Sequence, residues 1–207
     1  MDSAAKHSSF KLPETIPLIV LEECYLFPGC FLPLYIFEQR YRQMLDYALQ
    51  TSRMFCVGIR SNGKILPVTT AGLIRASKKQ EDGTSHVMLY GVTRIRFTGW
   101  VQEEPFHIAK IEPIATDCDL TPDKRDALKD RALTLLPPPT PETSEAMQVL
   151  RSTLCDMSCA DLACDILSYH FVREPETMQA LLAEPCLAKR YHLLHDELER
   201  LQALTQG

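Results

Sequence analysis

Apolar residues in the first half of the chain, from Thr15 to Ile114, come in short runs separated by turn residues. The runs read TIPLIVLE, MFCVGIR, TTAGLIRASKKQ, SHVMLYG, VTRIRFTGW and FHIAKIEPI. They are rich in β-branched and aromatic residues, which is typical of strands. Asp82-Gly83 separates two of them and is a strong hairpin signal, and Asn62-Gly63 marks another turn. The pattern predicts a curled sheet or barrel of short strands.

One helix interrupts these strands, at about Glu38 to Thr51. Its apolar residues recur at positions i, i+3, i+4, i+7 and i+8 and form a single stripe: Tyr41, Met44, Leu45, Ala48 and Leu49. We expect this stripe to cap the sheet, and we place Glu38 in the first turn, where a carboxylate is favoured. Gln39, Arg40 and Gln43 fall elsewhere on the helix and are expected to be exposed.

Beyond Ile114 the pattern changes to helices. Thr121 followed by Pro122 is a helix-start signal, and the proline run at 137–139 ends that first helix. Four more helical segments follow, at residues 142–157, 159–171, 174–184 and 186–204. In the last one a seam at spacings of 4, 3, 4 and 3 is expected to be buried inside the chain: Leu187, Tyr191, Leu194, Leu198 and Leu201.

These patterns predict an α+β fold in three parts. Residues 1–14 form a flexible N-terminal tail, residues 15–116 form the β lobe, and residues 117–207 form an all-helical lobe. The boundary between the lobes is expected between Ile114 and Thr121, and no long strand is expected after it.

Composition narrows the classes of partner. The 207 residues are 45% hydrophobic and 24% charged, and their longest apolar runs are far below the ~20 residues that a membrane helix needs. A net charge of −5 argues against a nucleic-acid partner, because phosphate binding needs a basic surface. No secretory signal is evident, so we expect a cytoplasmic protein whose eight cysteines are unpaired and bind no metal.

No catalytic, cofactor or metal motif is complete. Gly58, Gly63 and Lys64 nearly form a phosphate-binding loop, but Ile65 replaces the hydroxyl residue that would hold magnesium. The chain has no GxSxG elbow, and His192 and His195 lack a metal-site signature around them. We therefore predict no catalytic residue, no metal and no cofactor.

Three segments together resemble the N-terminal domain family of Lon proteases. IPLIVLEECYLFPGCFLPLYIFEQRYRQML, residues 16–45, is similar to its apolar strand, Phe-Pro-Gly turn, Leu-Pro-Leu strand and capping helix. Residues 71–97 resemble its Gly-x-Ile strand, Asp-Gly hairpin and Gly-x-x-Arg strand, and residues 160–198 resemble its C-terminal helices. The chain departs from the family pattern at Gln39, where proline is common, and at residues 93–95.

The resemblance implies a PUA-like β pseudo-barrel with one capping helix, followed by a helical bundle. The resemblance is especially strong to stand-alone bacterial members, which lack the ATPase and Ser-Lys protease domains, and to eukaryotic RING-linked members. It implies a non-enzymatic module that captures unfolded or partner polypeptides. The residues predicted to contact such a peptide are Tyr35, Phe37, Gln39, Arg40 and Gln43.

Alternatives remain at this stage. Phe31, Leu34 and Phe37 either fill the barrel as core residues or leave an exposed apolar patch for a partner. An RNA-binding function would need a continuous basic face made of Arg75, Lys78, Lys79, Arg94 and Arg96. A small-molecule enzyme would need a polar pocket between the lobes. Oligomerisation is left open.

Overall fold

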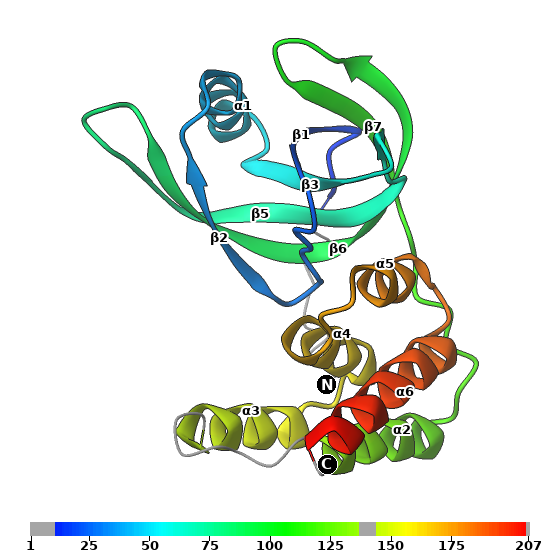
Figure 1. Ribbon diagram of the computed structural model, residues 1–207. Coiled ribbons are helices and arrows are strands. Elements are labelled where there is room, and N and C mark those ends of the chain that lie inside the picture. Colours follow the sequence, from blue (N-terminus) through cyan, green and yellow to red (C-terminus); the bar gives the residue numbers. More distant parts are fainter. Residues whose placement is uncertain (1–10, 137–143, 206–207) are drawn as a thin grey trace, which may run out of the picture.

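The chain folds into a β lobe followed by a helical lobe, as Figure 1 shows. The computed structural model describes residues 11–136 and 144–205. Helix α1, Gln39–Gln50, lies on one side of the sheet. The helical lobe lies on the other side, below β2, Phe31–Ile36, and β6, Ser85–Gln102, in Figure 1. The change from strands to helices falls between Pro113, the end of the last strand, and Pro122, the start of the next helix. The division into domains at residue 116 stays a prediction.

The β lobe is a curled sheet of seven strands: β1 Thr15–Leu21, β2 Phe31–Ile36, β3 Met54–Ser61, β4 Lys64–Ile65, β5 Val68–Lys79, β6 Ser85–Gln102 and β7 His107–Pro113. Its order is β1-β7-β6-β5-β3-β4, with β2 paired to β6. β1 also pairs with β3, so the sheet curls back on itself, but β2 and β4 lie off this curl. The predicted α+β pseudo-barrel is confirmed, and it is not a regular closed barrel.

Both predicted turns are present. Gly83 has a positive φ of 82° in the β5–β6 hairpin, where the Asp82 carboxylate accepts hydrogen bonds from the Thr84 amide and hydroxyl. Asn62-Gly63 joins β3 to β4. One boundary was wrong: residues 85–91 and 92–100 are not two strands but parts of one long strand, β6. β6 pairs with β2 through its first half and with β7 through its second half.

The Phe27-Pro28-Gly29 turn places β2 against the helical lobe. Gly29 has a φ of 77°, and a Cβ atom there would lie 2.2 Å from a Leu162 side-chain carbon. Only glycine combines this conformation with so close an approach. The Gly29 amide donates to the Gly91 carbonyl, and the Gly91 amide donates to the Cys30 carbonyl. The turn is therefore fixed to both β6 and helix α4, Ala160–Phe171, which contains Leu162.

Helix α1, Gln39–Gln50, follows β2 and buries the predicted stripe, with Tyr41, Met44, Leu45 and Ala48 inside. The Tyr41 hydroxyl accepts from the Val20 amide and donates to the Val20 carbonyl, which ties the helix to β1. Glu38 is the residue before the helix and not part of its first turn, which corrects the prediction. Its carboxylate binds Arg40 instead.

The helical lobe consists of α2 Pro122–Leu135, α3 Ser144–Asp156, α4 Ala160–Phe171, α5 Pro175–Ala183 and α6 Leu187–Thr205. The predicted seam of α6 is buried inside the chain, since Tyr191, Leu194 and Leu198 are fully inaccessible to solvent. The prolines at 137–139 lie outside the described residues, but α2 ends just before them. After Thr121 the described residues contain no strand.

The two lobes share one hydrophobic core. Tyr25 and Phe27 from the loop after β1, together with Cys30 and Ile59, pack into the cluster formed by the helices. Two other clusters lie within the β lobe, one under α1 and one on the opposite side of the sheet. Most of the predicted N-terminal tail, residues 1–10, lies outside the described residues. Leu12 packs against the last of these clusters.

In the parts of the chain that the structure describes, no helix is both long and apolar enough to cross a membrane. All eight cysteines are described and none is paired. Burial raises the pKa of Cys30 and of Cys164 to about 12, so both remain protonated thiols at neutral pH.

Candidate functional site

Three aromatic side chains on and just after β2 are exposed. Phe31, Tyr35 and Phe37 are 51%, 50% and 58% exposed, whereas Ile36 between the last two is buried. Side chains on a strand alternate between its two faces, so only Leu32, Leu34 and Ile36 can face the core under α1. We call Phe31, Tyr35 and Phe37 the aromatic face. Of the two alternatives, the exposed patch holds for Phe31 and Phe37, because an all-apolar strand still has an outward side, whereas Leu34 packs against the core.

The aromatic face is supported by neighbouring rings on β6. Phe31 lies opposite Tyr90, with ring centroids 5.0 Å apart, and Tyr35 lies opposite His86, also at 5.0 Å. The rings of Tyr35 and Phe37 stack at 6.0 Å with an interplanar angle of 27°. The Tyr169 hydroxyl of α4 donates to the Phe31 carbonyl at 3.0 Å. These contacts hold the rings in place while one side of each remains accessible.

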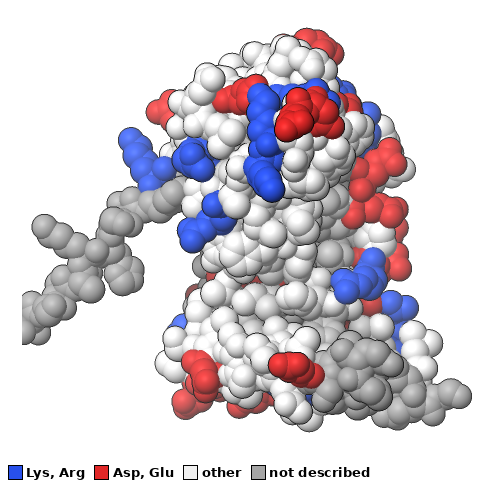
Figure 2. Space-filling model, turned by 90° about the vertical axis from the view of Figure 1, so that its left-hand side faces the viewer, with Lys and Arg blue, Asp and Glu red and all other residues white. Residues whose placement is uncertain are grey.

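A shallow groove of about 510 Å³ lies beside Tyr35 on the outer side of the sheet. β2, β6 and β5 each contribute to its walls, which include Pro33, Tyr35, Ala76, Lys78, His86 and Met88. β2 and the β5–β6 hairpin project to the left in Figure 1. Figure 2 views the molecule from that side and shows a middle region with few charged residues. The groove and the aromatic face therefore offer a mainly apolar surface.

The predicted helix residues are exposed, as expected, but they are less closely connected to the rings. Arg40 Nε donates to Glu38 Oε2 at 2.9 Å, and its guanidinium lies 4.5 Å from the centroid of the Tyr41 ring. Gln39 and Gln43 are exposed on α1. Among the described residues no interaction links these two glutamines to Tyr35 or Phe37. Of the five predicted residues, Tyr35 and Phe37 are therefore in direct ring contact. The other three are close to them in the sequence.

A buried cluster of charged groups lies where the two lobes meet. Arg94 of β6 donates to both oxygens of Asp165 on α4, one of them at 2.7 Å, and Arg190 of α6 donates to Asp165 Oδ1 at 2.9 Å. Asp161 accepts from Arg190 and from the Thr116 hydroxyl. Arg94 Nε also donates to the Leu182 carbonyl at 3.1 Å. We call Arg94, Asp161, Asp165 and Arg190 the charged junction.

The burial of Arg94 in the charged junction contradicts the continuous basic face that RNA binding would need. Arg94 is 4% exposed and turned toward the helical lobe, so it cannot reach an external phosphate. Arg96 lies 3.7 Å from the Glu112 carboxylate. Arg75, Lys78 and Lys79 are exposed. The continuous basic surface that RNA binding requires is therefore interrupted at Arg94.

Burial and charge act in opposite directions on the two junction carboxyls. At Asp161 burial tends to raise the pKa, but Arg190, Thr116 and Arg94 outweigh it and hold the pKa below its ordinary value. At Asp165, which is almost fully buried, burial raises the pKa and the two guanidiniums counteract it. All four carboxylate oxygens accept hydrogen bonds. The charges of the junction already neutralise one another, so none is left for a ligand. The junction instead joins the lobes, because Arg94 and Asp165 come from different lobes.

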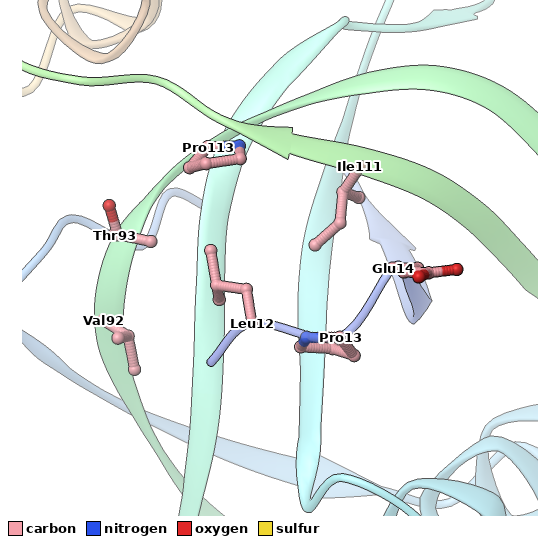
Figure 3. A pocket seen from close by; sticks show the side chains of 7 residues that line it. All are labelled: Leu12, Pro13, Glu14, Val92, Thr93, Ile111 and Pro113. Carbon is pink, nitrogen blue, oxygen red and sulfur yellow. The ribbon is translucent and has the colours of Figure 1, made fainter. Parts of the chain in front are cut away.

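One further cavity lies where the two lobes meet, and another lies on the β lobe. One of about 290 Å³ borders the charged junction and is lined partly by Arg94, Asp161 and Asp165. This is the polar pocket that an enzyme between the lobes would need, but its charged groups are already paired. The other, of about 570 Å³, is shown in Figure 3 and is lined by Leu12, Pro13, Glu14, Val92, Thr93, Ile111 and Pro113. Glu14 is its one ionisable side chain, and it contains none of the predicted site residues.

Metal ligands do not gather in the described residues, where no three His, Cys, Asp or Glu side chains could hold an ion together. His195 is buried, and its Nε2 lies 3.0 Å from the Leu128 carbonyl oxygen. His192, three residues earlier on the same helix, is exposed. The helix thus uses His195 for packing, as its place next to the α6 seam indicates.

Comparison with known proteins shows which family has this fold. The model of the ATP-dependent protease La (LON) substrate-binding domain family matches residues 15–200, which include both lobes, the aromatic face and the charged junction. The chain belongs to this family.

Similar full-length proteins are Lon proteases. The Lon protease of Desulfosudis oleivorans is 29% identical over 111 residues, which cover 49% of this chain and 14% of that protein. The Lon protease of Trichlorobacter lovleyi is 26% identical over 119 residues, covering 52% of this chain and 15% of that protein. The chain therefore spans about a seventh of the length of these relatives.

Solved structures of Lon domains have the same fold. A Lon N-terminal domain protein from Xanthomonas campestris superposes with a TM-score of 0.57 at 23% identity, covering 91% of this chain and 97% of that one. The N-terminal domain of the Mycobacterium avium complex Lon protease gives a TM-score of 0.71 at 15% identity, covering 89% and 97%. At these identities the likeness shows the fold alone. It confirms the predicted α+β fold.

Sequence reasoning missed several residues of this surface. The pattern leaves Phe31 open between core and surface, and it does not connect His86, Met88 and Lys78 with Tyr35. The pairing of β2 with β6 brings these residues together, and no sequence motif indicates this pairing. A signal was present in Pro33, because proline in a strand favours an edge position, and an edge strand has an accessible side.

Proposed function

We propose that this Lon substrate-binding domain recognises polypeptide segments through its aromatic face, and that unfolded or partner polypeptides are its ligands. The exposure of Phe31, Tyr35 and Phe37 is the observation that carries the proposal. Large apolar groups that stay accessible together mark an interaction surface more often than isolated ones do. Membership of a substrate-binding family supports a recognition role.

The physical basis is the burial of apolar surface. A ring that is already ordered loses little conformational entropy when a ligand covers its accessible side. Tyr35 is ordered by its ring contacts with His86 and Phe37, and Phe31 by its ring contact with Tyr90. Unfolded chains expose the apolar side chains that folded proteins bury, so this surface favours unfolded segments over folded surfaces.

Polar groups at the start of α1 would supply hydrogen bonds to the same ligand. Arg40 can exchange its exposed bond to Glu38 for a peptide carbonyl or carboxylate, since exposed ion pairs contribute little stability. The glutamines Gln39 and Gln43 can both donate and accept. The proposed site therefore comprises Tyr35, Phe37, Gln39, Arg40 and Gln43, with Phe31 added by the structure.

Recognition without catalysis is the function that these groups favour. Among the described residues, the aromatic face and the groove beside it present no nucleophile paired with a base, and the charged or titratable side chains nearby include the exposed Arg40, Lys78 and His86. RNA binding is less favoured because Arg94 is buried in an ion pair. We place the function in the cytoplasm, where eight unpaired cysteines are stable.

A binding titration with a permanently unfolded, fluorescently labelled test protein checks the proposal. Tyr35→Ser combined with Phe37→Ser should weaken binding at least about tenfold, because two partly exposed rings at a binding centre contribute ~1.4 kcal/mol or more together. Trp100→Ser is the matched control, since Trp100 is an aromatic residue 43% exposed at the other end of β6. Equal weakening by both variants, or by neither, would contradict the aromatic face.

A further inference from the structure

We propose that the groove beside Tyr35 selects segments in which an acidic side chain lies close to an apolar one. This preference rests on the proposed function, because it defines which polypeptides the aromatic face would bind. It follows from the order of side chains across three paired strands.

Two rows of side chains cross the outer side of the sheet. In the first row Pro33 of β2, Met88 of β6 and Ala76 of β5 are register partners, and all three line the groove. The row is entirely apolar. It offers a floor for an aliphatic or aromatic side chain of the ligand.

The second row lies two residues further along each strand and has a different character. Tyr35 is opposite His86, and His86 is opposite Lys78. Tyr35 and His86 are in ring contact at 5.0 Å, and both His86 and Lys78 are exposed. This row offers an ammonium group and an imidazole N–H, both of which donate to a carboxylate.

The spacing of the rows matches an extended ligand. Positions two residues apart on a strand are separated by about 6.6 Å. Side chains at i and i+2 of an extended peptide are separated by the same distance and point to the same side. A segment with an apolar residue at i and Asp or Glu at i+2 can therefore place the first over the Pro33 row and the second over the Lys78 row.

The local charge supports an anionic ligand although the whole chain has a net charge of −5. Two acidic residues near this part of the lobe are already engaged: Asp46 lies 3.8 Å from Lys79, and Glu38 lies 2.9 Å from Arg40. The Asp82 carboxylate is held by Thr84. Within the described ranges Lys78 has no acidic partner. It is therefore available for a carboxylate of the ligand, and it would repel a lysine or arginine.

Two labelled peptides of equal length and equal apolar content test the inference, one with Asp at the i+2 positions and one with Lys. Binding by fluorescence anisotropy at low salt should favour the acidic peptide at least about fivefold, as exposed attraction and repulsion together allow. Lys78→Glu should reverse this preference, and Lys78→Gln should remove it. Lys64→Glu is the control, since Lys64 is an exposed lysine on β4, and it should leave the preference unchanged.

The outcomes separate this inference from the proposed function. If both peptides bind wild-type protein equally and Tyr35→Ser with Phe37→Ser weakens both, the charge preference is wrong and the aromatic face stands. If the aromatic substitutions affect neither peptide, the proposed function fails. If Lys64→Glu changes the preference as much as Lys78→Glu does, the effect is one of overall charge and the groove does not select. Displacement of the acidic peptide by single-stranded RNA in a Lys78-dependent way would also overturn the assignment to polypeptides.

Discussion

The charged junction and the aromatic face reverse the usual distribution of residues. At the junction Arg94, Asp165 and Arg190 are charged but almost completely buried, and each of them has an oppositely charged partner. On the aromatic face Tyr35 and Phe37 are at least half exposed, and each retains an accessible ring surface. A buried charge needs its partner inside the chain, whereas an exposed ring gains most from a partner outside it. The contrast separates the residues that assemble the domain from those available to a ligand.

Removing the central carboxylate of the junction should have the largest effect. Asp165→Ala leaves two buried guanidiniums without their shared partner and should lower the free energy of unfolding by about 3–5 kcal/mol. Urea denaturation measures the loss. Glu112→Ala is the control, because it removes the exposed partner of Arg96 and should cost less than about 1 kcal/mol. A loss below that control would mean that the lobes do not depend on the junction.

The second-largest effect is expected in the pH dependence of stability, because the junction contains the ionised Asp161. Arg190, Thr116 and Arg94 hold the pKa of Asp161 below its ordinary value, against the effect of burial. The ionised group therefore stabilises the fold above the unfolded pKa of about 4, and this stabilisation is lost as the pH falls through the lower folded value. Thermal unfolding between pH 6 and about pH 2 should show a steeper acid loss for wild type than for Asp161→Asn. Parallel curves would contradict this assignment.

The aromatic face should show the opposite balance between stability and binding. Phe37→Ser alone should change the unfolding free energy by no more than about 1 kcal/mol, because the side chain is 58% exposed and mainly loses its stacking with Tyr35. Its affinity for the unfolded test protein should nevertheless decrease about threefold or more. Paired urea and anisotropy measurements on the same sample check both. A destabilisation comparable to that of Asp165→Ala would place Phe37 in the core after all.

The smallest effect is expected at the start of α1. Arg40→Glu with Gln43→Glu should leave the thermal midpoint nearly unchanged, since exposed substitutions shift stability by about ±0.5 kcal/mol. Binding to the unfolded test protein should weaken about twofold to threefold through lost polar contacts. Lys64→Glu again serves as a control for added negative charge. Unchanged binding would exclude these two residues from the site and move the recognition surface toward the region between the lobes.

Local patterns in the sequence predict most of the secondary structure. The Tyr41-Met44-Leu45-Ala48 stripe, the Thr121-Pro122 helix start and the Asp82-Gly83 hairpin each depend on residues close together, and all three are present. These signals report which way a backbone turns and which side of it is buried. They suffice for elements whose apolar and polar positions differ.

Two features could not be predicted in this way. β2 is apolar on both sides, so alternation cannot indicate that Phe31 and Tyr35 face outward. Arg94 lies in an alternating strand that resembles any half-exposed strand, and its partner Asp165 is 71 residues away. Both assignments depend on which element packs against which side of the sheet, and that information is long-range.

The order of elements in the first lobe also has a consequence for how specificity can change. β2 and the start of α1 follow one another directly, so Phe31, Tyr35, Phe37, Arg40 and Gln43 all fall within one short continuous stretch of chain. The junction residues, in contrast, are distributed from β6 to α6. Exchange of the exposed side chains of this stretch for those of another family member would therefore replace the aromatic face in a single block while the junction contacts stay in place. The aromatic face and the charged junction are encoded in separable parts of this sequence.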